Sequence, residues 1–439
     1  MRLCLIVLAC CVAAAGQNSD ADYKVYTEHP RLLLKAQRLR LLKRERERTS
    51  PRWNQFETLM RGKAQMPEPA FALALFYQVT GEEPFGKQAI QAALQPSTPV
   101  RDVALAFDWC ESLLTPSDRA ALTKRLQQAL AGAASKDLSQ ARDRAFAGLV
   151  LGDGAALRQL ATAWWRGSTA PALVRGDRQI AHAELYPFLE LLHSVRDNLQ
   201  IDLRDDILPV FKDLAVERVL GYYPAVWPAA ENEYRIPHFS GKGEPDLRIS
   251  ALNRAAEMAL VAFENNAQES QFLQGWLMHD RFVLRGAFGV PYEFLWANPY
   301  QPGLPFEKLP LRYHNPRTGT LLLRSSWNDD ATWVGWFGGA GQMFTDGRIG
   351  ALQIRKPLEI GEAVLLTGDR ALTKIILPKE SPEQWFIVGL KPQTTYDIET
   401  DEEGMTDAKT DRAGILSLHP RRRVGQSVFV HEPRKAPAQ

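Results

Sequence analysis

The sequence predicts a multidomain protein with a helical part over residues 24–305 and an antiparallel β part over residues 311–432. Apolar residues recur at helical spacing up to about Pro310 and at strand spacing after it. Helix start and stop signals occur in the first part, and short β-rich runs separated by turn formers occur in the second. The two patterns follow one another without interleaving, which is typical of separate helical and β domains.

Residues 1–15 have the pattern of a secretory signal peptide. Arg2 precedes an apolar run over residues 3–12, and small residues follow up to a cleavage position after Ala15. A positive charge, an apolar core and a small-residue cleavage site make up such signals. No other stretch approaches the roughly 20 apolar residues of a membrane helix. We therefore expect an exported protein, secreted or periplasmic, with no membrane span.

Cysteine positions bear on processing and on disulfides. Acylation of Cys10 or Cys11 would make the chain a lipoprotein, although the apolar run before Cys10 is short for that reading. After cleavage Cys110 has no cysteine partner within the chain, so no internal disulfide is expected. Cys110 lies within an apolar helical segment, which favours a small core residue.

Helix boundaries are marked by capping residues. Ser50 and Thr115 each precede a proline, which places a capping hydroxyl before the first helical position. The apolar run over residues 71–79 ends before Gly81, and residues 87–94 form the returning helix. A further apolar stripe consists of Ile207, Phe211, Leu214, Ala215 and Val219. The expected unit is a hairpin of two helices.

Short strands are expected after residue 310. The β-rich runs cover residues 319–325, 332–337, 351–355, 363–367, 372–377, 385–390, 395–400, 414–419 and 427–431. Turn formers such as Gly338-Gly339 and Asp346-Gly347 separate them. Strands at this spacing with no helices between them predict a small antiparallel β-sandwich.

The charge balance argues against a nucleic-acid partner, but it does not identify a different partner. The 53 lysines and arginines nearly balance the 51 acidic residues, so there is no global field suited to nucleic acid. The basic residues over 35–48 are interleaved with leucines and broken by Glu45 and Glu47. A solvated helix face is the first interpretation, and a groove for an anionic polysaccharide is the alternative.

Four short motifs resemble the heparinase II/III-like family. They are His-Pro-Arg-Leu-Leu-Leu over residues 29–34, Ala-x-x-x-Asp-Trp over 104–109, Gly-Thr-Leu-Leu-Leu-Arg-Ser-Ser-Trp over 319–327 and Ala-Thr-Trp-Val-Gly-Trp over 331–336. The resemblance implies an incomplete α/α toroid packed on an antiparallel β-sandwich. It also implies an exported polysaccharide lyase that acts on uronate-containing polymers, with an acidic polysaccharide or oligosaccharide as partner.

The sequence departs from that family at the usual catalytic and metal positions. When Gly350 is taken as the anchor, the family's histidine places hold Phe344 and Asp346, and the place of its acid holds Arg348. The helix over residues 141–152 has no Asn or His to neutralise a carboxylate. Sets of three histidines and carboxylates with metal-ligand spacing are not evident. We therefore expect no zinc site and no cofactor.

Elimination from a uronate needs a donor that neutralises the carboxylate, a base that takes the carbon proton and an acid for the leaving oxygen. Residues 231–241 hold the densest local supply of such groups. We assign proton transfer to His238 and Tyr234. We assign the carboxylate to Arg235 or Asn232.

Aromatic residues precede and adjoin this segment. Tyr222, Tyr223 and Trp227 offer faces for sugar rings, and Glu233 joins them in substrate binding. The alternative is that the aromatic residues only pack a long proline-containing connection against the protein. A long irregular segment within a helical domain favours a functional role.

His182 and Tyr186 form a second candidate pair. They are four residues apart and share a helix face, which suits the lining of a groove. A structural histidine with satisfied hydrogen bonds is the alternative.

Two other functions stay open at the level of sequence. One is a non-catalytic glycan-binding toroid protein. The other is a toroid glycoside hydrolase, in which Glu231 or Glu233 and Asp246 would serve as acid and base.

Overall fold

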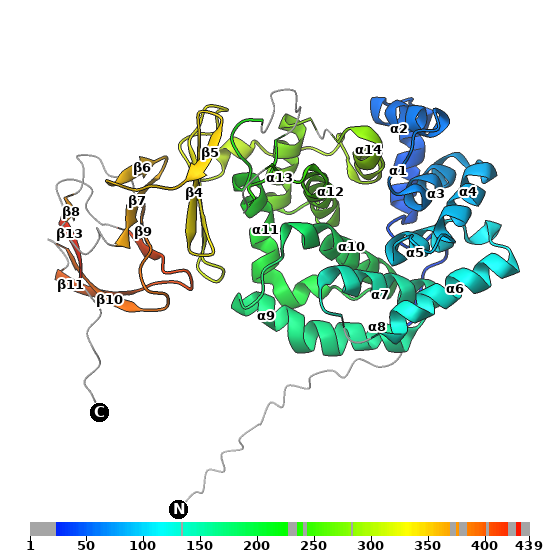
Figure 1. Ribbon diagram of the computed structural model, residues 1–439, viewed down its shortest axis with the longest axis horizontal. Helices are drawn as coiled ribbons and strands as arrows, with labels where there is room; N and C mark the ends of the chain where they lie inside the picture. Colours follow the sequence, from blue (N-terminus) through cyan, green and yellow to red (C-terminus); the bar gives the residue numbers. More distant parts are fainter. Residues whose placement is uncertain are drawn as a thin grey trace, which may run out of the picture.

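The computed structural model confirms the order of helices followed by strands (Figure 1). It describes residues 23–132, 135–226, 235–239, 244–281, 284–368, 375–376, 384–400, 404–419 and 427–431. The change from helices to strands falls between α14 and β1, which agrees with the predicted change near Pro310.

The first half of the helical part comprises α1 (Ala36–Glu47), α2 (Pro51–Arg61), α3 (Pro69–Thr80), α4 (Glu83–Ala93), α5 (Val100–Trp109), α6 (Pro116–Ala131) and α7 (Leu138–Leu151). The second half comprises α8 (Gly154–Gln159), α9 (Ala170–Arg175), α10 (His182–Leu199), α11 (Leu208–Leu220), α12 (Leu247–Phe263), α13 (Gln268–His279) and α14 (Gly286–Trp296). A π-helical segment, Leu160–Thr169, joins α8 to α9.

The predicted helix signals act as expected. The Ser50 hydroxyl accepts a hydrogen bond from the Trp53 backbone N–H at 3.2 Å, and Thr115 accepts one from Asp118 at 3.2 Å. Gly81 follows α3 with a φ of 77°, a left-handed conformation that glycine adopts without strain. Every residue of the predicted apolar stripe on and before α11 is buried.

The helices contact one another in a cyclic order. One series of contacts runs α3, α5, α7, α10, α12 and α14, and α14 then contacts α2 and α3 (Figure 1). The beginning and the end of the helical part therefore lie side by side. The series also places α10 against α12, the two helices that carry the candidate site.

The strands form three sheets. The first sheet is an antiparallel meander of β1 (Arg312–Asn315), β2 (Thr320–Arg324), β3 (Trp333–Phe337), β4 (Ala340–Thr345) and β5 (Arg348–Ala351). The second has the order β12 (Leu416–Leu418), β9 (Gln384–Val388), β7 (Ala363–Thr367) and β6 (Leu358–Ile360). The third has the order β11 (Gly404–Lys409), β10 (Thr395–Thr400), β13 (Ser427–His431) and β8 (Ile375–Ile376).

The structure corrects two predictions about the strands: the strand expected over residues 351–355 and the purely antiparallel arrangement. Residues 351–355, predicted as a strand, lie almost entirely in a loop after β5. The segment compared with a histidine-bearing loop is the hairpin of β4 and β5, whose two-residue turn has positive φ at both Asp346 (50°) and Gly347 (70°). In addition β7 pairs with β9 in parallel, which a purely antiparallel arrangement does not include.

The second sheet is covered on both faces. Leu365 and Phe386 pack with residues of the first sheet, whereas Leu366 and Ile387 pack with residues of the third. Burial on both faces explains why β7 and β9 are uninterrupted apolar runs instead of alternating ones. The three sheets are therefore stacked in layers.

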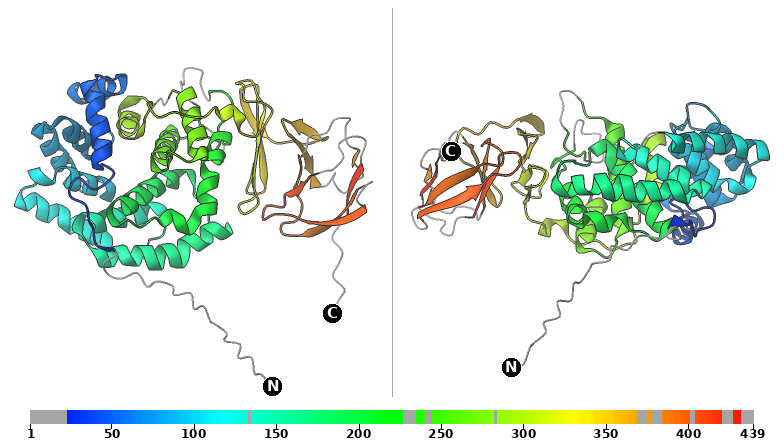
Figure 2. Two further views of the ribbon diagram at one scale, coloured as in Figure 1. Left: turned by 180° about the vertical axis from the view of Figure 1, so that it is seen from behind. Right: turned by 90° about the horizontal axis from the view of Figure 1, so that it is seen from below.

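The first sheet fastens the strands to the helical part (Figure 2). The Trp333 indole N–H of β3 donates to the Leu220 carbonyl at the end of α11, at 2.8 Å. Farther along, Arg412 forms an ion pair with Asp177 at 2.7 Å. The Trp333 bond holds β3 against the end of α11, and Phe337 of β3 lines the candidate site.

Candidate functional site

A cavity of about 570 Å³ lies between the helical part and the first sheet. It is formed where α10 and α12 begin, with the end of α11 and strands β2 and β3 as further walls. The lining residues that matter for chemistry are His182, Glu217, Arg218, His238, Asp246 and Phe337. The structure thus brings together two histidines that the sequence placed in separate candidate sets.

His238 is held in one tautomer by the backbone. Its Nδ1 lies 3.0 Å from the Gly221 carbonyl oxygen, which can only accept a hydrogen bond. Nδ1 therefore carries the proton, and Nε2 is left as an acceptor. The ring packs between Trp333, at 5.8 Å between centroids, and Phe337, at 4.7 Å. Burial, with a contribution from Arg218, lowers the pKa of His238 to about 4, so the side chain is neutral at pH 7.

His182 is the first residue of α10 and lies edge-on to His238, with 5.0 Å between the ring centroids. Burial lowers the pKa of His182 well below its ordinary value, and the nearby Arg218 and His238 add to that effect. Its backbone carbonyl accepts a hydrogen bond from Asn253 of α12 at 3.2 Å. That bond fixes the start of α10 against α12.

Arg218 supplies the positive charge of the cavity. It is only 5% exposed, and one Nη donates to Glu217 at 3.1 Å. Its Nε has no hydrogen-bond partner among the residues that the structure describes. A buried guanidinium N–H without an acceptor is costly, and an anionic ligand would satisfy it.

The start of α10 adds to the attraction for an anion. Ala181 precedes the helix and offers no side chain to cap its first backbone N–H groups. Ala181, His182 and Ala183 all line the cavity. Free N–H groups at a helix N-terminus carry a partial positive charge, so this wall also favours a carboxylate.

Three carboxylates line the cavity, and two of them are already engaged. Asp246 caps α12 and accepts hydrogen bonds from the backbone N–H groups of Arg248 at 2.9 Å and Ile249 at 3.1 Å. Glu217 accepts from Arg218 and from the Tyr313 hydroxyl, the latter at 3.2 Å. Neither of these two carboxylates is placed as a free acid or base, whereas the third, Glu244, is exposed.

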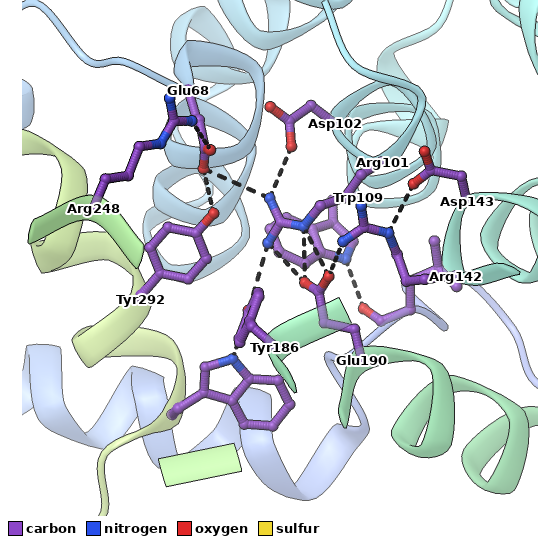
Figure 3. Close-up of polar contacts among 12 residues, drawn as sticks. Glu68, Arg101, Asp102, Trp109, Arg142, Asp143, Tyr186, Glu190, Arg248 and Tyr292 are labelled. Carbon is purple, nitrogen blue, oxygen red and sulfur yellow. Dashed lines mark hydrogen bonds and ion pairs between the residues drawn. The ribbon is translucent and has the colours of Figure 1, made fainter. Parts of the chain in front are cut away.

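Tyr186 does not share the cavity with His182. Its hydroxyl accepts a hydrogen bond from the Trp296 indole at 2.9 Å and lies beside Arg101 and Glu190 in a buried charged cluster (Figure 3). The four-residue spacing of His182 and Tyr186 predicted that both line one groove. His182, in the first turn of α10, does line the cavity, whereas Tyr186, one turn later, is only 2% exposed. The predicted groove lining is thus wrong for Tyr186.

Arg235 also lies elsewhere. Its guanidinium forms ion pairs with Asp280, at 2.9 Å, and with Asp329, and its Nε donates to the Pro224 carbonyl at 2.7 Å. These contacts tie the connection between α11 and α12 to the protein. Arg218 therefore lies at the cavity, where the sequence predicts Arg235 or Asn232.

Tyr222 and Tyr223 are packing residues and do not present faces to solvent. The Tyr222 hydroxyl donates to Glu257 at 2.8 Å, and the Tyr223 hydroxyl donates to Gln342 of β4 at 2.8 Å. Both residues are fully buried, because this connection is pressed between the helices and the first sheet. The remaining candidates, Trp227, Asn232, Glu233 and Tyr234, lie outside the described residues, as does Glu231.

Arg218 and Phe337 are the site residues that the sequence interpretation missed. For Arg218 a signal exists, because it lies four residues after Leu214 and seven after Phe211, on the apolar stripe of α11. An arginine on a buried helix face requires a partner or a function. For Phe337 there is no local signal, because β3 reaches the cavity only through the packing of the sheet.

Among the described residues, no group of three or more His, Cys, Asp or Glu side chains is arranged to hold a metal ion. No described helix combines the length and the hydropathy needed to cross a membrane. No protein-family model matches the chain, and no curated protein matches it either. The geometry of the cavity is therefore the principal guide to function.

The low pKa of His238 has a consequence for stability. Because unfolding returns the pKa from about 4 to near 6.5, the unfolded state binds more protons between these values, and acidification through this window destabilises the fold. The loss from this residue at pH 5 is about 1–2 kcal/mol, allowing for its partial exposure. Urea unfolding at pH 7.5 and pH 5 should show a smaller acid-induced loss for His238→Gln than for the unmodified protein.

Other groups titrate in the same range, so only that difference is informative. Burial raises the pKa of Glu257 and of Glu293 to about 7, and these carboxyls favour the folded state as the pH falls. Equal acid-induced losses in the two proteins would show that His238 is not buried in its neutral form.

Proposed function

We propose that this chain is an exported, heparinase II/III-like polysaccharide lyase that cleaves uronate-containing polysaccharides by β-elimination. The observation that carries the proposal is the neutral His238 with Nε2 free to accept a proton, in one cavity with Arg218 and the uncapped start of α10. A base and a positive wall are two of the three elements that elimination next to a carboxylate requires, and the imidazolium formed from the base can serve as the third, the acid.

The architecture that we propose for this function is an α/α toroid joined to a β-sandwich. The cyclic order of helix contacts and the meeting of α14 with α2 and α3 support the toroid. The stacked sheets with shared apolar layers support the sandwich. The cavity at the junction of the two parts is open to solvent and not enclosed, which suits a ligand that binds from outside.

In the proposed reaction the uronate carboxylate binds against Arg218 and the first N–H groups of α10. Neutralising that carboxylate makes the C5 proton more acidic, and Nε2 of His238 removes it. The C5–H electron pair forms the C4=C5 double bond while the C4–O bond breaks. The imidazolium returns its proton to the departing oxygen, which leaves no net proton change. His182 is placed to hydrogen-bond the sugar as a neutral side chain.

The low pKa of His238 also explains why a substrate must be anionic. A low pKa makes His238 a weak base in the empty cavity and its imidazolium a strong acid. A bound carboxylate favours the protonated form and raises that pKa toward the working pH. Substrate therefore improves the base that acts on it.

The proposal is tested by incubating the mature protein with a panel of uronate polymers and following the ultraviolet absorbance of the unsaturated product. Absorbance with at least one polymer supports a lyase. Binding without absorbance on any polymer would instead identify a glycan-binding protein. New reducing ends without absorbance would identify a hydrolase, an outcome that the capping role of Asp246 disfavours.

A further inference from the structure

A second cavity lies at the opposite ends of α10 and α12. It has a volume of about 200 Å³ and shares no lining residue with the first cavity. Along α10, His182 lines the first cavity and His193 the second, which places them about 16 Å apart at 1.5 Å per residue. The N-terminal part of α1, from the basic stretch noted in the sequence, forms one wall.

Arg38 is the charged centre of this cavity. Its guanidinium lies 4.3 Å from the centroid of the Trp296 ring, and one Nη donates to the Leu295 carbonyl at 3.1 Å. Arg38 has no ion pair with any described residue, although a guanidinium offers five N–H donors. Burial lowers the pKa of Arg38 to about 10, and the nearby Asp197 offsets only part of that effect.

The neighbouring cations are fixed in position. Lys35 pairs with Asp197 at 2.5 Å, and Arg52 pairs with Glu45 at 2.7 Å. Arg196 donates to the Phe263 carbonyl at the end of α12, at 2.8 Å. Together with Arg38, the lining has more positive than negative side chains, so the cavity attracts an anion.

The rest of the lining suits a sugar. The side-chain amides of Gln37 and Asn265 are exposed and have no hydrogen-bond partner among the described residues. The Tyr300 ring is 59% exposed, and the Arg48 guanidinium lies over one face of it, 5.7 Å from its centroid. Free amides pair with hydroxyl groups, and an exposed aromatic face stacks on a sugar ring.

We propose that this cavity is a second binding site, for an acidic saccharide. The carboxylate of the ligand pairs with Arg38, its hydroxyls bond to Gln37 and Asn265, and its ring lies against Tyr300. A structural role as a cation at the end of α14 accounts for the Leu295 contact of Arg38. It does not account for the free amides and the exposed ring beside that cation. The ligand class rests on the proposed function, whereas binding here requires no catalysis.

The test uses methyl glucuronide, which has no sugar leaving group at C4 and so reports binding without cleavage. Isothermal titration calorimetry is carried out on the full chain that carries the Arg218→Gln substitution, because this substitution removes the arginine charge of the first cavity. We expect one remaining site, weakened at least about tenfold by Arg38→Gln. Arg44→Gln is the matched control, because Arg44 is exposed on the same helix and does not line the cavity.

Three results would overturn the inference. They are equal binding by the Arg38→Gln and Arg44→Gln variants, equal binding of neutral methyl glucoside, and displacement of the glucuronide by inorganic sulfate at similar concentration. If Arg38→Gln does not fold, Asn265→Ala must weaken binding instead, since that exposed amide supports no helix packing. Ligand-dependent protection from hydrogen exchange must fall on residues 35–42 and 296–301. If the protein shows no lyase activity but still binds methyl glucuronide at this cavity, the proposed function is rejected and the second binding site is not.

Discussion

Replacement of His238 by alanine is expected to lower the rate of elimination by about 10²–10⁴-fold, the usual contribution of a positioned base. The reason is that Nε2 of the neutral His238 ring is free to take a proton while Nδ1 is anchored to Gly221. The measurement is the initial rate of product absorbance on the best polymer substrate. Because the pKa of the free side chain is about 4, kcat/KM should rise from pH 3.5 and level off above pH 5.

The loss must be separated from general damage to the protein. His431→Ala is the control, because His431 pairs with Glu399 on the third sheet at 2.8 Å, away from the cavity. It should retain the unmodified rate. His238→Ala should keep its folded circular dichroism spectrum and its binding of substrate. Full activity in this variant would remove His238 from the reaction and would move the search for the base to another residue.

Local chemistry explains which parts of the fold were predictable. The Ser50 and Thr115 caps and the stop at Gly81 each depend on residues within about one helical turn, and the α11 stripe recurs at helical spacing, so the sequence reveals all of them. The parallel pairing of β7 with β9 depends on a contact across an intervening segment, which no local pattern encodes. The same limit applies to the stacking order of the sheets.

The candidate site, like the fold, has a part that the sequence could predict and a part that it could not. The sequence identifies His238 because residues 231–241 are dense in groups that can transfer protons, and His182 because it lies four residues before Tyr186. The centroids of the two rings come within 5.0 Å because α10 packs against the connection that follows α11. The spacing of residues in the sequence does not reveal this contact between two segments. Tyr222, Tyr223 and Arg235 were chosen for their chemistry, but burial had already committed each of them to a structural partner. Residue type identifies candidates, and only burial and partners separate a free group from an engaged one.

Replacement of Glu190 by alanine is expected to destabilise the protein by about 3–5 kcal/mol, the cost of removing one partner from a buried ion pair. Glu190 is fully buried on α10 and accepts hydrogen bonds from Arg101 of α5, at 2.8 Å, and from Arg142 of α7 (Figure 3). Burial alone would raise the pKa of Glu190, but the two guanidiniums hold it below its ordinary value. Urea unfolding at pH 7.5 measures the loss.

The matched control is Glu83→Gln, which removes an exposed pair with Lys87 on α4 and should cost no more than about 0.5 kcal/mol. A similar small loss in Glu190→Ala would mean that water reaches Arg101 and Arg142 once the carboxylate is gone.

Most of the stability lost in Glu190→Ala comes from the buried guanidiniums of Arg101 and Arg142, which lose their shared acceptor. Less of it comes from the loss of the carboxylate itself. Arg101 keeps Asp102 as a partner at 2.8 Å, and Arg142 keeps Asp143 at 2.7 Å, but each of those acids lies at one edge of the cluster. Replacing Glu190 and Arg142 together, by leucine and methionine, should therefore recover part of the stability that Glu190→Ala loses. Recovery would show that the cluster joins α5, α7 and α10 through charge balance, and that an apolar contact of similar volume can take its place. A double variant less stable than Glu190→Ala would instead show that Arg142 stabilises α7 independently of Glu190.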